Sequence, residues 1–201
     1  MKKLRNTIWP YAVALAGGLL IIVFFASSLV PQVKAGGEVM AKFNASGEMI
    51  RPEGWREWIY VGTPVTPNSL NPPEAAFPEM HSVYIDPKSW AHYKKTGEFR
   101  EGTMLAKELT LVGATQATSG KGFFMGEFSG FEIAYKSAKR FPNEPANWAY
   151  FSFGHKPEPY NATAKAMPTA ACAACHTASA AEDMVFTQYY PVLRAHKGKG
   201  N

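Results

Sequence analysis

Cysteine is scarce in this sequence. Only two cysteines occur among 201 residues, and they lie three positions apart, at Cys172 and Cys175. So small a number excludes a disulfide-rich secreted scaffold, which joins several cysteine pairs. It also excludes a structural zinc site with four cysteine ligands. The role of the two cysteines therefore has to be inferred from the residues beside them.

An excess of charge is also missing from most of the chain. The net charge is +5, but residues 1–35 contain four basic residues and no acidic residue, so the remainder carries only +1. Surfaces that bind nucleic acid are usually strongly basic. We therefore expect no nucleic-acid partner.

The N-terminus has a basic start, followed by an uncharged and mainly apolar run from residue 6 to residue 33. Small residues follow this run, and the whole pattern predicts a secretory signal peptide over residues 1–35. The apolar part also reaches the length of about 20 residues that spans a bilayer, so an uncleaved membrane anchor is the alternative. In both cases we expect residues 36–201 to form one domain in the periplasm.

The two cysteines belong to the sequence Cys172-x-x-Cys175-His176. This C-x-x-C-H motif is typical of covalent c-type haem attachment. Two thiols at this spacing lie on one helical face and can bond to the two vinyl groups of a porphyrin, while the adjacent imidazole binds the iron. We therefore predict haem c as the cofactor, with Cys172 and Cys175 as attachment residues and His176 as the iron ligand.

Three other uses of the motif are a disulfide, a redox-active dithiol and half of a zinc site. A thioredoxin-like dithiol opens a helix after a strand in a βαβ unit, and the residues before Cys172 do not predict such a unit. A zinc site needs a second pair of ligands, which the cysteines cannot supply. The motif in an exported chain therefore favours haem.

Hydrophobic alternation predicts an α+β fold that is mainly β, with an antiparallel sheet of about five strands, short helices and a C-terminal haem-binding helix. Asp86 and Pro87 are typical of the start of a helix, as N-cap and first helical residue, and this helix is expected to end near Gly97. The expected strands cover residues 55–61, 81–85, 103–112, 122–128 and 147–153, whereas residues 131–141 fit either a strand or a short helix.

Lys107 lies in the apolar row of the expected strand 103–112, between Leu105 and Leu109. A lysine in such a row either extends its amine to the edge of the core or has a chemical role. If the amine is enclosed, it is more easily held in its neutral, nucleophilic form. Such an amine beside a porphyrin edge could bond to it.

Several motifs together resemble the cytochrome P460 family. They are the C-terminal C-x-x-C-H motif, Val83-Tyr84-Ile85-Asp86-Pro87, the run from Gly97 to Leu109, and Asn143-Glu144-Pro145-x-Asn147-Trp148. The resemblance covers nearly all of residues 36–201. It implies a periplasmic homodimer, mainly of β-sheet, that carries one c-type haem.

The resemblance also implies roles for particular residues. Lys107 matches the lysine that is cross-linked to the porphyrin edge, and His176 matches the axial ligand. His81 stands where family members often have an arginine over the distal face of the haem, so it is a candidate catalytic residue. Active members use a distal carboxylate as base, but residues 160–171 contain no acid, which leaves Glu79 and Glu127 as weak substitutes.

The implied function is that of an enzyme that oxidises hydroxylamine, through an iron-nitrosyl species, to nitrous oxide or nitrite. Electrons would pass to a cytochrome c, and nitric oxide would bind the same iron. One alternative is a gas-binding protein like the β-type cytochromes c prime, which share the fold and lack the cross-link. Another is a non-catalytic electron carrier, in which Met184 or Met167 would be the sixth iron ligand.

Overall fold

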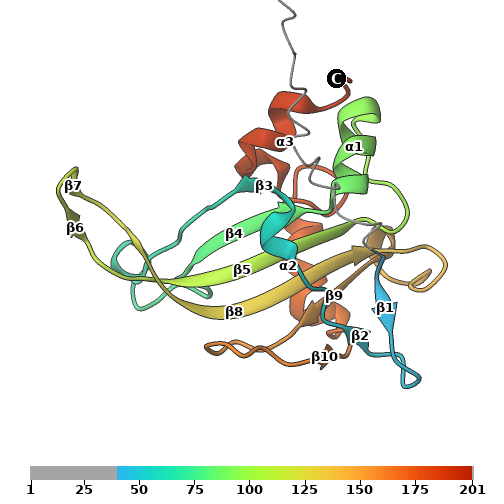
Figure 1. Ribbon diagram of the computed structural model, residues 1–201, viewed down its shortest axis with the longest axis horizontal. Coiled ribbons are helices and arrows are strands. Elements are labelled where there is room, and N and C mark those ends of the chain that lie inside the picture. The colour runs from blue at the N-terminus through green and yellow to red at the C-terminus, as the bar shows by residue number, and fades with distance from the viewer. Residues whose placement is uncertain (1–39, 201) are drawn as a thin grey trace, which may run out of the picture. The chain divides into compact units, whose positions relative to one another are not determined.

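The computed structural model describes residues 40–200 (Figure 1). Its centre is a five-stranded antiparallel sheet with the strand order β3-β4-β5-β8-β9. The signal segment predicted for residues 1–35 lies outside the described residues. None of the helices between residues 40 and 200 is both long and apolar enough to cross a membrane. The five strands are β3 (Ile59–Gly62), β4 (Met80–Ile85), β5 (Met104–Val112), β8 (Met125–Lys136) and β9 (Trp148–Ser152).

This sheet confirms the predicted fold class, a mixed α+β structure in which strands dominate. The segment 131–141, which fitted either a strand or a helix, is strand as far as Lys136, where β8 ends. The C-terminal helix expected around the C-x-x-C-H motif is also present. The three α-helices of the described chain are α1 (Pro87–Thr96), α2 (Thr169–Ser179) and α3 (Pro191–His196).

The strand predicted for residues 55–61 is wrong in its first half. Trp55–Glu57 form the 3-10 helix η1, and β3 starts only at Ile59. Trp55 and Trp58 are both buried, and the ring of Trp55 lies 4.2 Å from that of Phe131. A 3-10 helix has three residues per turn and therefore places residues three apart on the same side, whereas a strand would point them to opposite faces.

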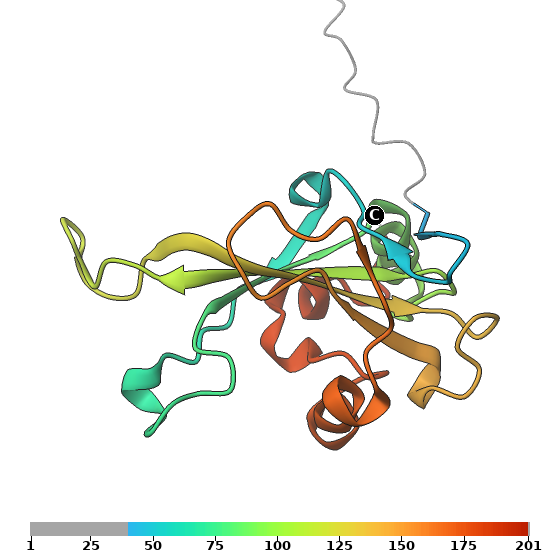
Figure 2. The same ribbon diagram turned by 90° about the horizontal axis from the view of Figure 1, so that it is seen from below.

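The two faces of the sheet bury different cores, because successive residues of a strand point to opposite sides. In β5, Met104 and Ala106 join Phe131 in one core, whereas Leu105 joins Val83 in the other. Figure 2 shows the sheet edge-on, with α2 and α3 on one side and the N-terminal strands on the other. These are β1 (Lys42–Phe43) and β2 (Met49–Ile50), which form a small sheet with β10 (Thr163–Ala164).

The register of the central sheet decides which side chains share the α2 side. Lys107 of β5 lies opposite Val83 of β4 and opposite Glu132 of β8, and Glu132 lies opposite Ser152 of β9. In the next row, His81 lies opposite Leu109. Four strands that are distant in the sequence therefore bring one row of side chains together beneath α2.

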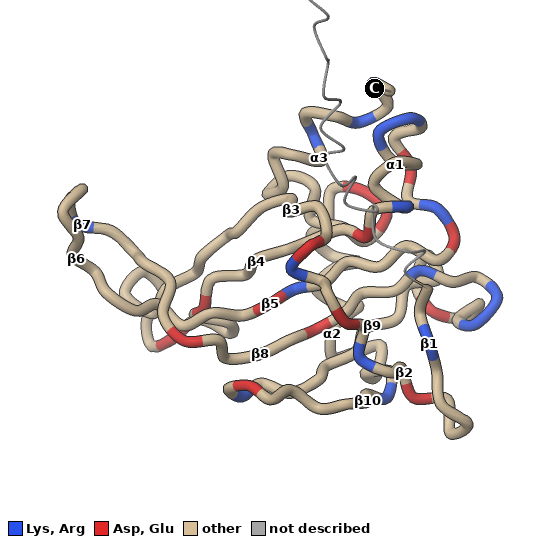
Figure 3. Tube along the Cα trace, viewed as in Figure 1, with Lys and Arg blue, Asp and Glu red and all other residues tan. Residues whose placement is uncertain are grey.

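The remaining elements are short connections. A proline-rich loop with η2 (Asn68–Leu70) joins β3 to β4, and the hairpin of β6 (Gln116–Ala117) and β7 (Gly120–Lys121) extends beyond the sheet between β5 and β8 (Figure 1). Two more 3-10 helices are η3 (Pro145–Asn147) and η4 (Thr187–Tyr189). Figure 3 shows acidic and basic residues interspersed along the described trace.

Asp86 connects α1 to the sheet. It is fully buried, and its Oδ1 accepts a hydrogen bond from the backbone N–H of Ser89, 2.9 Å away, as the predicted N-cap should. Its Oδ2 accepts from the backbone N–H of Met104 at 2.9 Å, where β5 begins. The helix ends at Gly97, which has a φ of 80°. One carboxylate therefore caps a helix and fixes the start of the central strand.

We expect Asp86→Asn to lower the free energy of unfolding by about 2 kcal/mol, because an amide group has one oxygen and its NH₂ would face a buried N–H donor. Chemical denaturation of the holoprotein checks this. Glu98→Gln, the same change at an exposed carboxylate, is the control and should cost at most about 0.5 kcal/mol. Equal stability of the two variants would contradict the role of Asp86.

Candidate functional site

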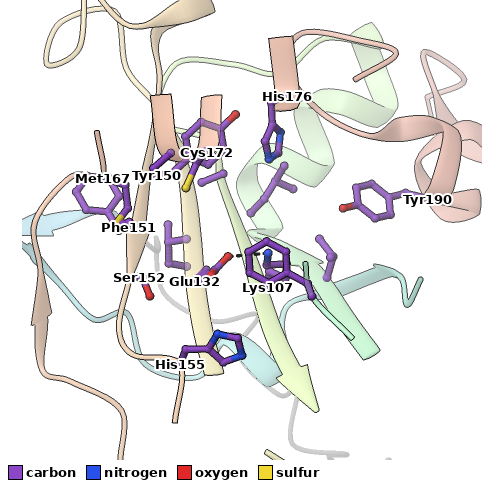
Figure 4. Close-up of a pocket in the computed structure, with 16 residues that line it drawn as sticks. Lys107, Glu132, Tyr150, Phe151, Ser152, His155, Met167, Cys172, His176 and Tyr190 are labelled. Carbon is purple, nitrogen blue, oxygen red and sulfur yellow. Dashed lines mark ion pairs between the residues drawn. The ribbon is translucent and has the colours of Figure 1, made fainter. Parts of the chain in front are cut away.

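A cavity of about 300 Å³ lies between α2 and the sheet face that carries Lys107. Figure 4 shows Cys172 and His176 entering from the helix side, whereas Lys107 and Glu132 come from the strands. Most of the wall is apolar, which is typical of sites for small molecules and cofactors. Other side chains in the wall are those of Phe77, Leu105, Tyr150, His155, Met167 and Tyr190.

Helix α2 presents Cys172 and His176 to this cavity from one helical face, because they lie four residues apart. Cys175 is exposed, and both cysteines are free thiols. Burial raises the pKa of the Cys172 thiol. The two thiols that could attach a porphyrin are therefore unjoined, and one of them is at the cavity wall.

His176 is held in one tautomer. Its Nδ1 lies 2.6 Å from the carbonyl oxygen of Met184, and since a carbonyl can only accept, Nδ1 donates. Its ring lies between Tyr150 and Phe186, with centroids 4.5 and 4.6 Å away. Burial, and to a smaller extent the charge of Lys107, lowers the pKa of His176. The neutral ring thus keeps Nε2 free, as a metal-ligating histidine requires.

The carbonyl that orients His176 comes from a turn with unusual backbone angles. Asp183 and Met184 have φ values of 44° and 64°, a region that residues other than glycine seldom occupy. The Asp183 carboxylate holds this turn, because it accepts hydrogen bonds from Lys136 Nζ at 2.8 and 2.9 Å and from Trp148 Nε1 at 3.3 Å. Met184 therefore belongs to the His176 side of the site.

Lys107 extends from β5 into the same cavity. Its Nζ lies 2.6 Å from Glu132 Oε2 and 4.6 Å from the centre of the Phe77 ring. Its side chain is 27% exposed, so the amine is neither sealed in the core nor free in water. Cys172 and His176 line the same cavity from the side of α2 (Figure 4).

The family model of cytochrome P460 matches residues 52–187 of this chain. The chain belongs to the cytochrome P460 family. A comparison with curated proteins found no match. Membership in the family implies a haem protein. The matched residues include Lys107, both cysteines and His176, and every residue of the cavity wall except Tyr190 lies within the matched range.

The residues of the cavity fit a covalently held haem. Cys172 and Cys175 would bond to the vinyl groups, and His176 Nε2 would bind the iron. The hydroxyl of Tyr150 is buried in the wall and has no hydrogen-bond partner among the described residues. Buried polar groups are nearly always paired, so an orphan here is typical of a wall shaped around another molecule.

His81 is less central than the resemblance implies. It lines a neighbouring hollow of about 450 Å³, whereas Phe77 lines both that hollow and the cavity. His81 Nε2 lies 3.3 Å from the carbonyl oxygen of Phe77, and the two rings meet edge to face. Burial and the charge of Lys107 lower the pKa of His81, so its ring is neutral at pH 7. His81 thus supports Phe77 from outside the cavity.

Two groups at this site were not predicted from the sequence. Glu132 was not predicted because its segment fitted either a strand or a helix, and because only the register of β5 with β8 places it opposite Lys107. His155 is at the cavity wall and pairs with the buried carboxylate of Glu79. Glu127, the other acid considered as a base, is exposed on β8 and does not line the cavity.

We expect Asp183→Ala to release the turn that orients His176. The change removes hydrogen bonds from Lys136, which is 18% exposed, and from Trp148, which is fully buried, so stability should fall by about 2 kcal/mol. The haem reduction potential should rise, because a histidine that loses its carbonyl acceptor donates less electron density to iron. Redox titration checks this. Glu53→Ala, at an exposed site, should leave the potential unchanged.

The lowered pKa of His81 predicts an acid-sensitive fold. Below its ordinary value of about 6.5, the unfolded chain takes up a proton that the folded chain does not, so stability falls as the pH falls. His81→Gln should therefore make the free energy of unfolding of the holoprotein less dependent on pH between about 6.5 and 5. Urea unfolding at several pH values measures this. An unchanged dependence would mean that His81 is not the group responsible.

Proposed function

We propose that this chain is a c-type haem enzyme that oxidises hydroxylamine. Cys172 and Cys175 attach the haem, His176 is the proximal ligand, and Lys107 is cross-linked to the porphyrin edge. The observation that supports this proposal best is the position of Lys107, whose amine extends into the cavity that Cys172 and His176 enter from the other side. A lysine kept only for solubility would extend to water instead.

The residues of the cavity suit this reaction. When bound, haem supplies a metal that accepts electrons from hydroxylamine. His176 is oriented by the Met184 carbonyl and burial lowers its pKa, so its Nε2 would hold that metal. Glu132 holds the Lys107 amine in one position, and the apolar wall limits the access of water to the reacting group.

The cross-link can be tested by breaking the thioether bonds. Silver salts cleave the bonds of c-type haem to cysteine, so an ordinary c-type haem is then released from the peptide. We expect haem to stay covalently bound to the peptide that contains Lys107 in the wild-type protein. In Lys107→Arg, which keeps the positive charge beside Glu132, the same treatment should release it. Mass spectrometry of the digested protein distinguishes these results.

Lys121→Arg is the matched control, because Lys121 is an exposed lysine on β7. It should retain the haem just as the wild-type protein does. Complete release of haem from the wild-type protein would disprove the cross-link. The optical spectrum of the ferrous protein gives a second readout, since a lysine bonded to the ring alters its electronic structure and Lys107→Arg should restore an ordinary c-type spectrum.

The proposed setting is the periplasm, where members of this family typically occur. The electron acceptor is proposed to be a cytochrome c, because hydroxylamine oxidation needs a partner that removes electrons one at a time. A homodimer is proposed from the resemblance to the family. Steady-state reduction of a cytochrome c by the holoprotein and hydroxylamine tests the activity, and an absence of turnover would disprove it.

One observation favours a second candidate function. Met167, just before α2, lines the cavity in a stretch that contains no acid, where active family members are expected to carry a distal carboxylate. An apolar wall there suits a protein that binds nitric oxide without oxidising hydroxylamine. If the ferrous protein binds nitric oxide but hydroxylamine is not consumed, this reading holds. A methionine-ligated carrier would instead resist added ligands.

A further inference from the structure

His155 and Glu79 form an acid–base pair at the cavity. His155 follows β9 in the loop after Gly154, and Glu79 immediately precedes β4. His155 Nε2 lies 2.5 Å from Glu79 Oε1. Figure 4 shows His155 at the end of the cavity opposite His176, with Lys107 and Glu132 between them. Neither residue has a role in the proposed function as stated above.

The two partners differ greatly in exposure. Glu79 is only 4% exposed, and its second oxygen, Oε2, is buried without a hydrogen-bond partner among the described residues. The His155 side chain is 48% exposed and also lines the cavity. A buried carboxylate is costly unless something pairs with it, and His155 supplies that pairing. The imidazole thus connects the cavity with solvent.

The geometry leaves one nitrogen of His155 available. A carboxylate oxygen can only accept, so Nε2 donates to Glu79, and Nδ1 of the neutral ring carries a free lone pair. The Phe77 ring stacks on that of His155, with centroids 6.1 Å apart and planes 16° from parallel. Gly154 has a φ of 117°, which only glycine adopts readily, so the backbone turns sharply there. The ring is therefore oriented from three sides.

We propose that His155 is the catalytic base that takes a proton from hydroxylamine, and that Glu79 is its positioning residue. The inference rests on the proposed function, since it names the base that hydroxylamine oxidation needs. Other candidates suit the task less well. Glu132 Oε2 lies 2.6 Å from Lys107 Nζ and would still accept the one N–H that this nitrogen keeps after cross-linking, and His81 lines only the outer hollow.

In the proposed step, an N–H bond of hydroxylamine breaks and the proton moves to His155 Nδ1. The electron pair of that bond stays on the substrate nitrogen, and the cytochrome c acceptor of the proposed function is the oxidant that finally takes up the electrons. The proton on Nε2 remains with Glu79, whose negative charge stabilises the imidazolium. The titratable groups that share the cavity with His155 include Lys107 of β5 and Glu132 of β8. Once Lys107 is cross-linked its nitrogen is uncharged, so the negative charge of Glu132 also favours the imidazolium. The exposed side of the ring then returns the proton to water.

His155→Ala in the holoprotein is expected to slow hydroxylamine oxidation by about 100-fold, within the range for loss of a general base. Added imidazole should restore part of the rate. The amide of His155→Gln can still donate to Glu79, so this variant keeps the buried pair and should fold. It should be as slow as His155→Ala, because an amide cannot act as the base. His92→Gln, at a histidine on α1 that does not line the cavity, is the matched control and should keep the wild-type rate.

Glu79→Gln keeps the shape of the side chain but removes its charge. If Glu79 positions His155, the Glu79→Gln variant should oxidise hydroxylamine about tenfold more slowly than the wild-type protein. The acidic limb of its pH–rate profile should move to lower pH, because the imidazolium loses its counter-charge. Glu127→Gln, at the exposed acid of β8, should leave both the rate and the profile unchanged. A Glu79→Gln profile identical to that of the wild-type protein would overturn the positioning role.

Cyanide provides a test that does not depend on hydroxylamine turnover. Hydrogen cyanide must lose its proton to bind ferric haem, so a base in the cavity accelerates its association near pH 7. We expect His155→Ala to slow this association about 100-fold, with His92→Gln unchanged. An unchanged rate in His155→Ala overturns the inference. A wild-type protein that shows this base-assisted binding but no hydroxylamine turnover overturns the proposed function instead.

Discussion

The site depends on the antiparallel register of four strands. Because side chains alternate along a strand, a shift of one residue in β5 would turn Lys107 to the opposite core and replace it with Ala106 or Glu108. The observed register instead pairs Lys107 with Glu132 beneath α2. The observed register also gives the buried carboxylate of Glu108 its partner Arg56, and a slip of one residue would leave that charge without a partner. The position of the Lys107 amine is thus a consequence of how the whole sheet packs.

Two histidines at opposite ends of the cavity are held in opposite tautomers, because each ring donates one N–H to a fixed hydrogen-bond acceptor. An acceptor on a separate element takes the N–H of each ring: the Met184 carbonyl for His176 and the Glu79 carboxylate for His155. The first ring therefore offers Nε2 and the second offers Nδ1. A backbone carbonyl suits a ligand that must stay neutral, whereas a carboxylate suits a ring that becomes charged. The uncommon φ angles of Asp183 and Met184 indicate that the surrounding structure holds the Met184 carbonyl in place despite local backbone strain.

Much of the fold could be predicted from local pattern. Alternation identified β4 and β5, and Asp86 with Pro87 identified the start of α1, because these signals depend on neighbours within a few residues. The segment at Trp55 was wrongly assigned, since its two tryptophans are placed by a 3-10 turn against Phe131, a contact between residues far apart in the sequence. Strand propensity alone does not include such contacts.

For the site, the sequence by itself determined the chemistry of the cofactor end. The spacing of Cys172, Cys175 and His176 is a local property of one helix, and Lys107 stood out because a charge interrupted an apolar row. Only the tertiary structure decided that Glu132 would face Lys107 and that a loop histidine, His155, would meet the buried Glu79. Both pairings join residues from separate strands or loops, and which of them become neighbours depends on sheet register and loop packing, which no short window of sequence contains.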